Sequence, residues 1–137
     1  MKIAMIVCAI CASVAMAQPS EQLLDAIEQV ESGGRGANTP DGDGGKAIGP
    51  FQIHRAYWKD AVEFDRTIGG KYEDCRRPEY ARKVVRAYLT RYGKGKSNES
   101  LARMHNGGCG ILKRKATEAW NNTTIYWNRV RDAMQIE

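Results

Sequence analysis

One stretch, from Ile27 to Ile53, constrains the fold of this chain more than any other. It begins inside an amphipathic pattern whose apolar residues recur at helical spacing, namely Leu23, Leu24, Ile27 and Val30. Ser20 can cap this predicted helix at its start, and Gly33 can end it. Glu31 therefore falls at the margin of the buried stripe, where apolar neighbours are expected to raise the pKa of its carboxyl group. The alternative is an ordinary solvated glutamate at a helix end.

The second half of this stretch is rich in glycine. Residues 33–46 contain six glycines and Pro40, which predicts a turn-rich loop or a short irregular hairpin. The loop carries two acids, Asp41 and Asp43, but it lacks the downstream glutamate of an EF-hand, so calcium binding is a minor alternative. The following residues, 49–53, suit an edge strand or a turn. Among them Gln52 offers both a donor and an acceptor for a sugar hydroxyl or N-acetyl group.

The rest of the chain predicts helices. Apolar spacing indicates helices over 54–64, 78–93 and 97–104, and a final helical region over 115–134 that polar residues 121–124 are expected to break. Strand signals are scarce, so the fold class is mainly α in one domain. Glycines after residue 106 should release His105 and Asn106 from a helix end as candidate functional residues, although a lone histidine is more often structural. Trp58 is expected in the core, with substrate stacking as the alternative.

The N-terminus predicts export. A short apolar run from Ile3 to Val14 follows Lys2, and small residues precede Gln18, which indicates a signal peptide over 1–17 and a mature domain over 18–137. The run is shorter than the roughly 20 residues of a membrane span, and an N-terminal anchor is the alternative. We therefore expect a secreted, monomeric protein without stable membrane insertion.

Removal of the signal peptide would leave two cysteines, Cys75 and Cys109. In an oxidising compartment two such cysteines usually pair, so a disulfide is predicted, with two buried free thiols as the alternative. Their spacing predicts no metal site, and nothing in the sequence calls for a cofactor.

The chain is basic. Its net charge at pH 7 is +5, and it falls by one, to +4, when Lys2 is removed. A secreted basic domain concentrates at anionic surfaces such as bacterial walls. No nucleic-acid-binding module is present, so a nucleic-acid partner is not expected.

Glu31 and Asp43 suit glycoside hydrolysis, which needs one protonated acid and one ionised carboxylate in different environments. Because the chain has sixteen acidic residues, the presence of two suitable ones is by itself a weak signal of this activity. A series of short motifs makes the signal specific, because together they resemble the invertebrate-type (destabilase-like) lysozyme family. In chain order the motifs are Val30-Glu31-Ser32-Gly33, Gly49-Pro50-Phe51-Gln52-Ile53, Ala56-Tyr57-Trp58-Lys59-Asp60, Val85-Arg86-Ala87-Tyr88, Arg91-Tyr92-Gly93, Ala102-Arg103-Met104-His105-Asn106-Gly107-Gly108 and Tyr126-Trp127-Asn128-Arg129-Val130.

The resemblance implies an α+β lysozyme-like fold, with the glycine-rich loop beside the cleft, that hydrolyses the β-1,4 bond between N-acetylmuramic acid and N-acetylglucosamine in peptidoglycan. It implies Glu31 as general acid and an acid about a dozen positions later as nucleophile or stabiliser, which selects Asp43 and leaves Asp41 as second choice. Substrate contacts are expected from a polar and aromatic set, Gln52, Tyr57, His105 and Asn106.

This chain departs from the family in two ways. It has one possible disulfide where the family has many, so helix packing must hold the active loop. The stretch after Asp43 has no serine, so isopeptidase activity is not predicted.

Two rival functions share these motifs. A lytic transglycosylase needs only Glu31 and forms an anhydro-sugar. A catalytically inactive, cationic wall-binding protein would need only the charge.

Overall fold

The structure, a computed structural model, describes residues 18–135, so the predicted signal peptide over 1–17 lies outside the described residues. Within that range the chain forms five α-helices and one two-stranded sheet, which confirms the predicted mainly α class. The elements are α1 (Glu21–Ser32), β1 (Ala47–Ile48), β2 (Ile53–His54), α2 (Arg55–Phe64), α3 (Pro78–Gly93), α4 (Asn98–Gly107) and α5 (Glu118–Met134). Short 3-10 helices connect them, namely η1 (Gly36–Asn38), η2 (Asp43–Gly45), η3 (Arg66–Ile68), η4 (Tyr72–Arg76) and η5 (Ile111–Lys113).

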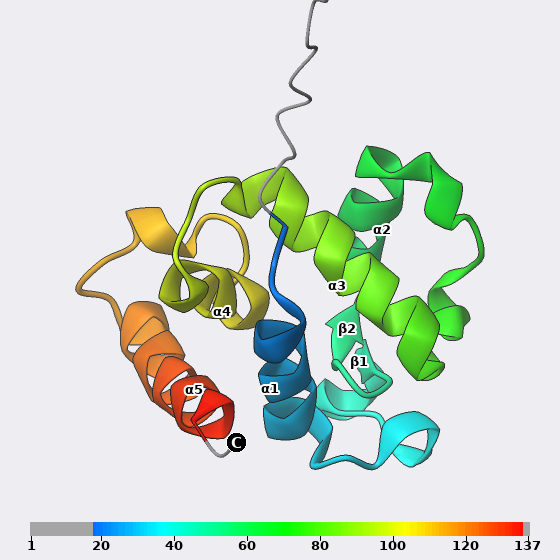
Figure 1. The fold of residues 1–137 in the computed structure, drawn as a ribbon, viewed down its shortest axis with the longest axis horizontal. Coiled ribbons are helices and arrows are strands. Elements are labelled where there is room, and N and C mark those ends of the chain that lie inside the picture. Colours follow the sequence, from blue (N-terminus) through cyan, green and yellow to red (C-terminus); the bar gives the residue numbers. More distant parts are fainter. Residues whose placement is uncertain (1–17, 136–137) are drawn as a thin grey trace, which may run out of the picture.

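The helices pack in pairs around α1. α4 packs on α5, α1 packs on α5, and α2 packs on α3. In Figure 1, α1 lies between α5 on one side and the small sheet on the other. All of these elements bury apolar side chains in one core, whose largest fully buried members are Phe51, Leu23, Leu24, Ile27, Ile48, Ile53, Leu89, Met104, Ile111, Val84, Val85 and Val130.

The ends of α1 follow the predicted capping. The Ser20 hydroxyl accepts a hydrogen bond from the Leu23 N–H at 3.1 Å, and Gly33 ends the helix in the left-handed conformation, with φ +60°. Because Leu23 and Ile27 are fully buried, the register of the helix is set by its apolar face. Glu31 consequently lies in the last turn, at the end of α1 that approaches the sheet.

The glycine-rich stretch leads into a compact hairpin. β1 pairs antiparallel with β2, and residues 49–52 form the turn between them, as one of the two predicted alternatives. Gly49 has φ +73°, and a Cβ atom there would lie 1.9 Å from the Cys75 carbonyl oxygen in η4. Glycine at this position thus lets the hairpin pack directly against η4.

The prediction that residues 121–124 break the last helix is wrong. α5 continues unbroken through residues 121–124, where the Thr123 and Thr124 hydroxyls donate to the Trp120 carbonyl oxygen, at 2.8 and 3.2 Å. α4 extends to Gly107, so His105 and Asn106 lie in its last turn.

Contacts between the two helices hold both of these segments in place. The buried guanidinium of Arg103 donates to the hydroxyl oxygens of Thr123 and Thr124, at 3.1 and 2.8 Å. Gly107 lets α4 approach α5, since a Cβ atom there would lie 2.7 Å from the Thr123 methyl group.

The predicted disulfide is also wrong, because Cys75 and Cys109 are both free thiols, the first buried and the second exposed. Cys75 lies just before Pro78, the first residue of α3. Cys109 donates its backbone N–H to the Tyr88 hydroxyl at 2.9 Å. Tyr88 lies ten residues after Pro78 in α3, which corresponds to about 15 Å along the helix axis. A disulfide needs Cα atoms within about 7 Å of each other.

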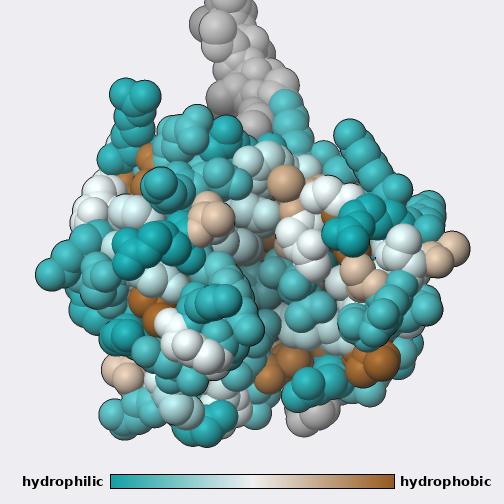
Figure 2. Space-filling model, turned by 180° about the vertical axis from the view of Figure 1, so that it is seen from behind, coloured by the Kyte–Doolittle hydropathy of each residue, from teal (hydrophilic) through white to brown (hydrophobic). Residues whose placement is uncertain are grey.

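The surface of the described residues is largely polar. Figure 2 shows the face opposite to that of Figure 1, where hydrophilic side chains dominate and hydrophobic ones form small separate patches. No helix within residues 18–135 combines the length and the apolar character that crossing a membrane would require.

Candidate active site

A cleft of about 210 Å³ lies where the end of α1, the hairpin and the end of α4 meet. It brings together both predicted catalytic acids and three of the four predicted substrate contacts. Its lining residues are Glu31, Asp43, Ala47, Gln52, His54, His105 and Asn106. Residues that are 75 positions apart in the chain thus share one cavity because α1, the hairpin and α4 all pack on the same core.

Glu31 is mostly buried, with 18% of its side chain exposed. The Nε2 atom of His105 lies 3.5 Å from its Oε1 atom. Burial raises the pKa of the Tyr126 hydroxyl well above its ordinary value, and the nearby Glu31 carboxylate adds to this effect. Glu31 therefore occupies a mostly buried position at the cleft, with a histidine beside it and a tyrosine nearby.

His105 is held from two sides, and only 3% of its side chain is exposed. Its Nε2 atom is 3.2 Å from the Phe51 carbonyl oxygen, and its Nδ1 atom is 3.0 Å from the Tyr57 hydroxyl. Because the carbonyl oxygen can only accept, Nε2 carries the hydrogen, and a neutral ring then accepts the Tyr57 hydrogen at Nδ1. This tautomer presents an N–H group on the side of Glu31.

Asp43 approaches the cleft from η2. It has φ +48°, a left-handed conformation that aspartate tolerates better than most side chains. Its side chain is 62% exposed, and its Oδ2 atom lies 3.4 Å from the Nε2 atom of His54. The second acid of the cleft is thus more solvated than Glu31.

Asp41 lies in a different environment and does not line the cleft. Its Oδ2 atom accepts a hydrogen bond from Arg76 Nη2 at 3.0 Å, and its Oδ1 atom accepts one from Arg76 Nη1. These bonds hold the pKa of the Asp41 carboxyl group below its ordinary value. The two loop acids are therefore distinguished by geometry, one in the cleft and one tied to η4.

Gln52 supports the loop from within the cleft. Its Nε2 atom donates to the carbonyl oxygens of Pro40, at 3.2 Å, and Gly49, at 3.0 Å. Its Oε1 atom packs so closely on Gly42 that a Cβ atom there would lie 2.1 Å away. Much of the hydrogen-bonding capacity of Gln52, which was expected to bind a sugar, is thus used within the protein.

A second cleft of about 240 Å³ continues from the first and shares His54, His105 and Asn106 with it. Tyr57, the fourth predicted substrate contact, lines this part and stacks on Tyr88 with 3.6 Å between ring centroids. Sequence reasoning missed Tyr88 and His54. His54 could have been found as the only other histidine of the chain.

Trp58 does not line either cleft. It packs against the core, and its indole N–H donates to the Tyr80 hydroxyl at 2.9 Å. In residues 18–135 no group of three His, Cys, Asp or Glu side chains comes together as a metal site would require.

Comparison with known proteins identifies a family and two relatives of this chain. A family model described as Destabilase matches residues 20–133. Lysozyme 1 of Crassostrea virginica is 36% identical over 117 residues, which cover 82% of this chain and 58% of the relative. A lysozyme of Ostrea edulis is 34% identical over 93 residues, which cover 63% of this chain and 59% of the relative. The chain thus spans less than two thirds of the length of either relative.

Proposed function

This chain belongs to the Destabilase family, that of the invertebrate-type lysozymes, and from this premise we propose that it is a secreted peptidoglycan hydrolase. The bond cleaved is the β-1,4 linkage between N-acetylmuramic acid and N-acetylglucosamine. One observation carries the proposal: the two acids selected from the sequence, Glu31 and Asp43, line the same cleft. Both relatives named above are themselves described as lysozymes.

We assign the two acids different roles because their surroundings differ. Glu31, mostly buried beside His105, is the general acid that donates its proton to the glycosidic oxygen as the bond to C1 breaks. The Asp43 carboxylate, more solvated, attacks C1 to form a glycosyl-enzyme, or stabilises the positive charge there. Glu31, having lost its proton, then takes one from water, whose oxygen bonds C1 as the bond between C1 and the Asp43 carboxylate breaks, and the sugar leaves with retained configuration.

The remaining cleft residues are proposed to bind the sugars. Asn106 is exposed in the cleft, so its amide is available to a hydroxyl or N-acetyl group. Tyr57 offers an aromatic edge in the continuing cleft. Gln52 is proposed to contact the substrate through the part of its side-chain amide that faces the cleft. His105, predicted as a substrate contact, is proposed instead to position Glu31, because only 3% of its side chain is exposed.

Digestion of purified peptidoglycan, followed by mass analysis of the sugar ends, tests the proposal. The parent protein is expected to release fragments with reducing ends. Glu31→Gln and Asp43→Asn should each lower the rate about 100-fold or more, because each removes one of the two carboxylates. Asp41→Asn is the matched control and should keep most of the activity, since Asp41 is tied to Arg76 outside the cleft.

Other outcomes would identify the rival functions. Anhydro-muramic ends with an active Asp43→Asn variant would identify a lytic transglycosylase. Bacterial agglutination without any bond cleavage, unchanged in Glu31→Gln, would identify a wall-binding protein.

A further inference from the structure

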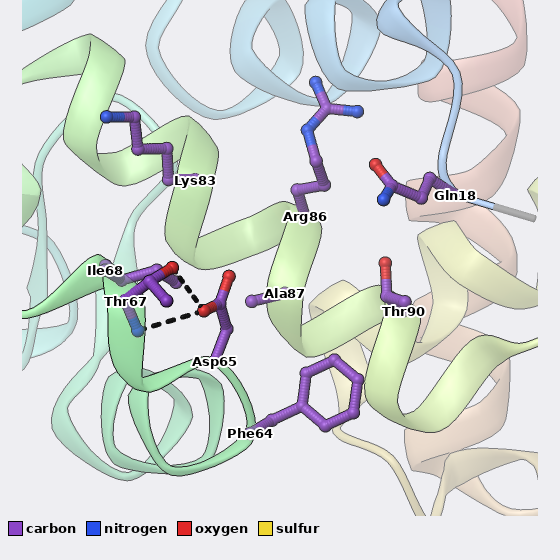
Figure 3. A pocket seen from close by; sticks show the side chains of 9 residues that line it. All are labelled: Gln18, Phe64, Asp65, Thr67, Ile68, Lys83, Arg86, Ala87 and Thr90. Atoms are coloured by element: carbon purple, nitrogen blue, oxygen red, sulfur yellow. Dashed lines mark hydrogen bonds between the residues drawn. The ribbon is translucent and has the colours of Figure 1, made fainter. Parts of the chain in front are cut away.

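A cavity of about 280 Å³ lies away from the active-site clefts, between the end of α2, η3 and the middle of α3. None of its lining residues lines either part of the active-site cleft. Figure 3 shows Phe64 and Asp65 entering it from one side and Thr90 from the other. The proposed hydrolysis makes no use of this cavity.

The Thr90 hydroxyl is the first sign that the cavity binds a ligand. Thr90 is 8% exposed, and its Oγ1 atom has no hydrogen-bond partner among the described residues. In Figure 3 this oxygen points into the cavity, toward Gln18. A buried hydroxyl without a partner is unfavourable, and a polar ligand atom would satisfy it.

Asp65 offers a second polar group. Its Oδ1 atom accepts hydrogen bonds from the backbone N–H of Thr67, at 3.0 Å, and from the Thr67 hydroxyl, at 2.6 Å. These two bonds fix the carboxylate, and no residue among those described donates to its Oδ2 atom. Oδ2 therefore remains available as an acceptor in the cavity (Figure 3).

Phe64 supplies an apolar wall. It is 43% exposed, and it is one of two large hydrophobic side chains exposed to this extent among the described residues. A half-exposed ring beside polar groups is suited to a ligand with one apolar face and several hydroxyl groups.

The charges around the cavity favour a neutral ligand. The Asp65 carboxylate repels an anion, and the positive charges of Lys83 and Arg86 repel a cation. Arg86 is already engaged, because it donates to the Pro19 carbonyl oxygen at 3.1 Å and to the Glu21 carboxylate.

We propose that this cavity is a second saccharide site, in which one neutral sugar ring packs on Phe64 and bonds to Thr90 Oγ1 and Asp65 Oδ2. Its volume, just below the roughly 300–1,000 Å³ typical of small-molecule pockets, suits one ring. That the ring belongs to peptidoglycan rests on the proposed function. The site would then hold the polymer while the cleft releases its cut ends.

Amide NMR titration of the mature chain with N-acetylglucosamine tests the site directly. We expect shifts in residues 64–68 and 83–90, in addition to any shifts in the cleft. Phe64→Ala should weaken the binding measured at these residues about tenfold, while the matched control Ile125→Ala, another exposed apolar truncation, should leave it unchanged. Thr90→Val should weaken it too and should raise the melting temperature, since it removes the unpaired hydroxyl.

Three results would overturn the site: no shift at residues 64–68 and 83–90, shifts that survive both substitutions, or stronger shifts there with inorganic phosphate than with the sugar. Titration of the Glu31→Gln variant separates this inference from the proposed function. Sugar binding in the cavity without any hydrolysis by the parent protein would refute the hydrolase and keep the site.

Discussion

His105 shows how much the role of a residue depends on its neighbours. Its ring is almost fully buried, bonded at Nε2 to the Phe51 carbonyl oxygen and at Nδ1 to the Tyr57 hydroxyl, with Glu31 Oε1 3.5 Å away. A side chain this enclosed has little surface left for a sugar. It is better placed to orient the Glu31 carboxyl group and to keep water away from it.

Tyr57→Phe separates orientation from substrate contact. It removes the hydroxyl at His105 Nδ1 while keeping the ring that stacks on Tyr88. If Tyr57 acts through His105, kcat on peptidoglycan should fall about tenfold with KM unchanged, because His105 Nδ1 loses its hydrogen-bond partner and the ring is held less firmly beside Glu31. Steady-state kinetics measures both quantities. Tyr80→Phe is the control, since that hydroxyl donates to the Gly69 carbonyl oxygen at 2.6 Å and neither residue lines either cleft. An increase in KM alone would instead make Tyr57 a substrate contact.

At the scale of elements, the pairing of α4 with α5 depends on Arg103. Its guanidinium bonds Glu99, the Trp120 carbonyl oxygen and two threonine hydroxyls, and it lies 4.0 Å from the centre of the Trp120 ring. These contacts keep α5 helical through polar residues 121–124. They also hold the end of α4, where His105 and Asn106 lie, against the core.

Arg103→Ala should lower the free energy of unfolding by about 2–4 kcal/mol, because it leaves buried acceptors without a donor. Urea denaturation measures this loss. Arg131→Ala is the matched control. Arg131 is 47% exposed, whereas Arg103 is 6% exposed, so the control should change stability by less than about 0.5 kcal/mol. Equal effects of the two substitutions would show that the Arg103 contacts do not stabilise the pair.

At the scale of the whole molecule, several buried acids of high pKa couple folding to alkaline pH. Burial raises the pKa of the Cys75 thiol to about 12, with a smaller contribution from Asp74. Burial likewise raises the pKa of the Tyr57 and Tyr126 hydroxyl groups. In the unfolded chain these groups lose their protons near their ordinary values of 9.0 for cysteine and 10.0 for tyrosine.

The unfolded chain therefore binds fewer protons than the folded one once the pH exceeds about 9. The stability contributed by these groups is complete below that pH and is lost as the pH rises toward 12. Thermal denaturation followed by circular dichroism should show a melting temperature that falls steadily between pH 9 and 11. A melting temperature constant over that range would contradict the burial of these groups.

Short-range features of the fold could be predicted well. The cap at Ser20, the stop at Gly33, the start at Pro78 and the loop after residue 33 depend on neighbours within a few positions. The position of Glu31 at a helix end could be predicted because the apolar periodicity of that helix involves only residues close in the sequence. What failed involved partners far apart in the chain, as with Arg103 and the threonines of α5, or Cys75 and Cys109.

The catalytic pair shows the same division. Local pattern and family motifs alone determined that Glu31 lies at the end of a buried helix, that Asp41 and Asp43 share a glycine-rich loop, and that the chain resembles the destabilase-like lysozymes. Only the tertiary structure decided which aspartate faces the cleft, because Arg76 lies 35 residues beyond Asp41 and bonds it to η4. The environment of a side chain depends on the segments that pack against it in the fold. Spacing along the sequence does not predict which distant segments those are.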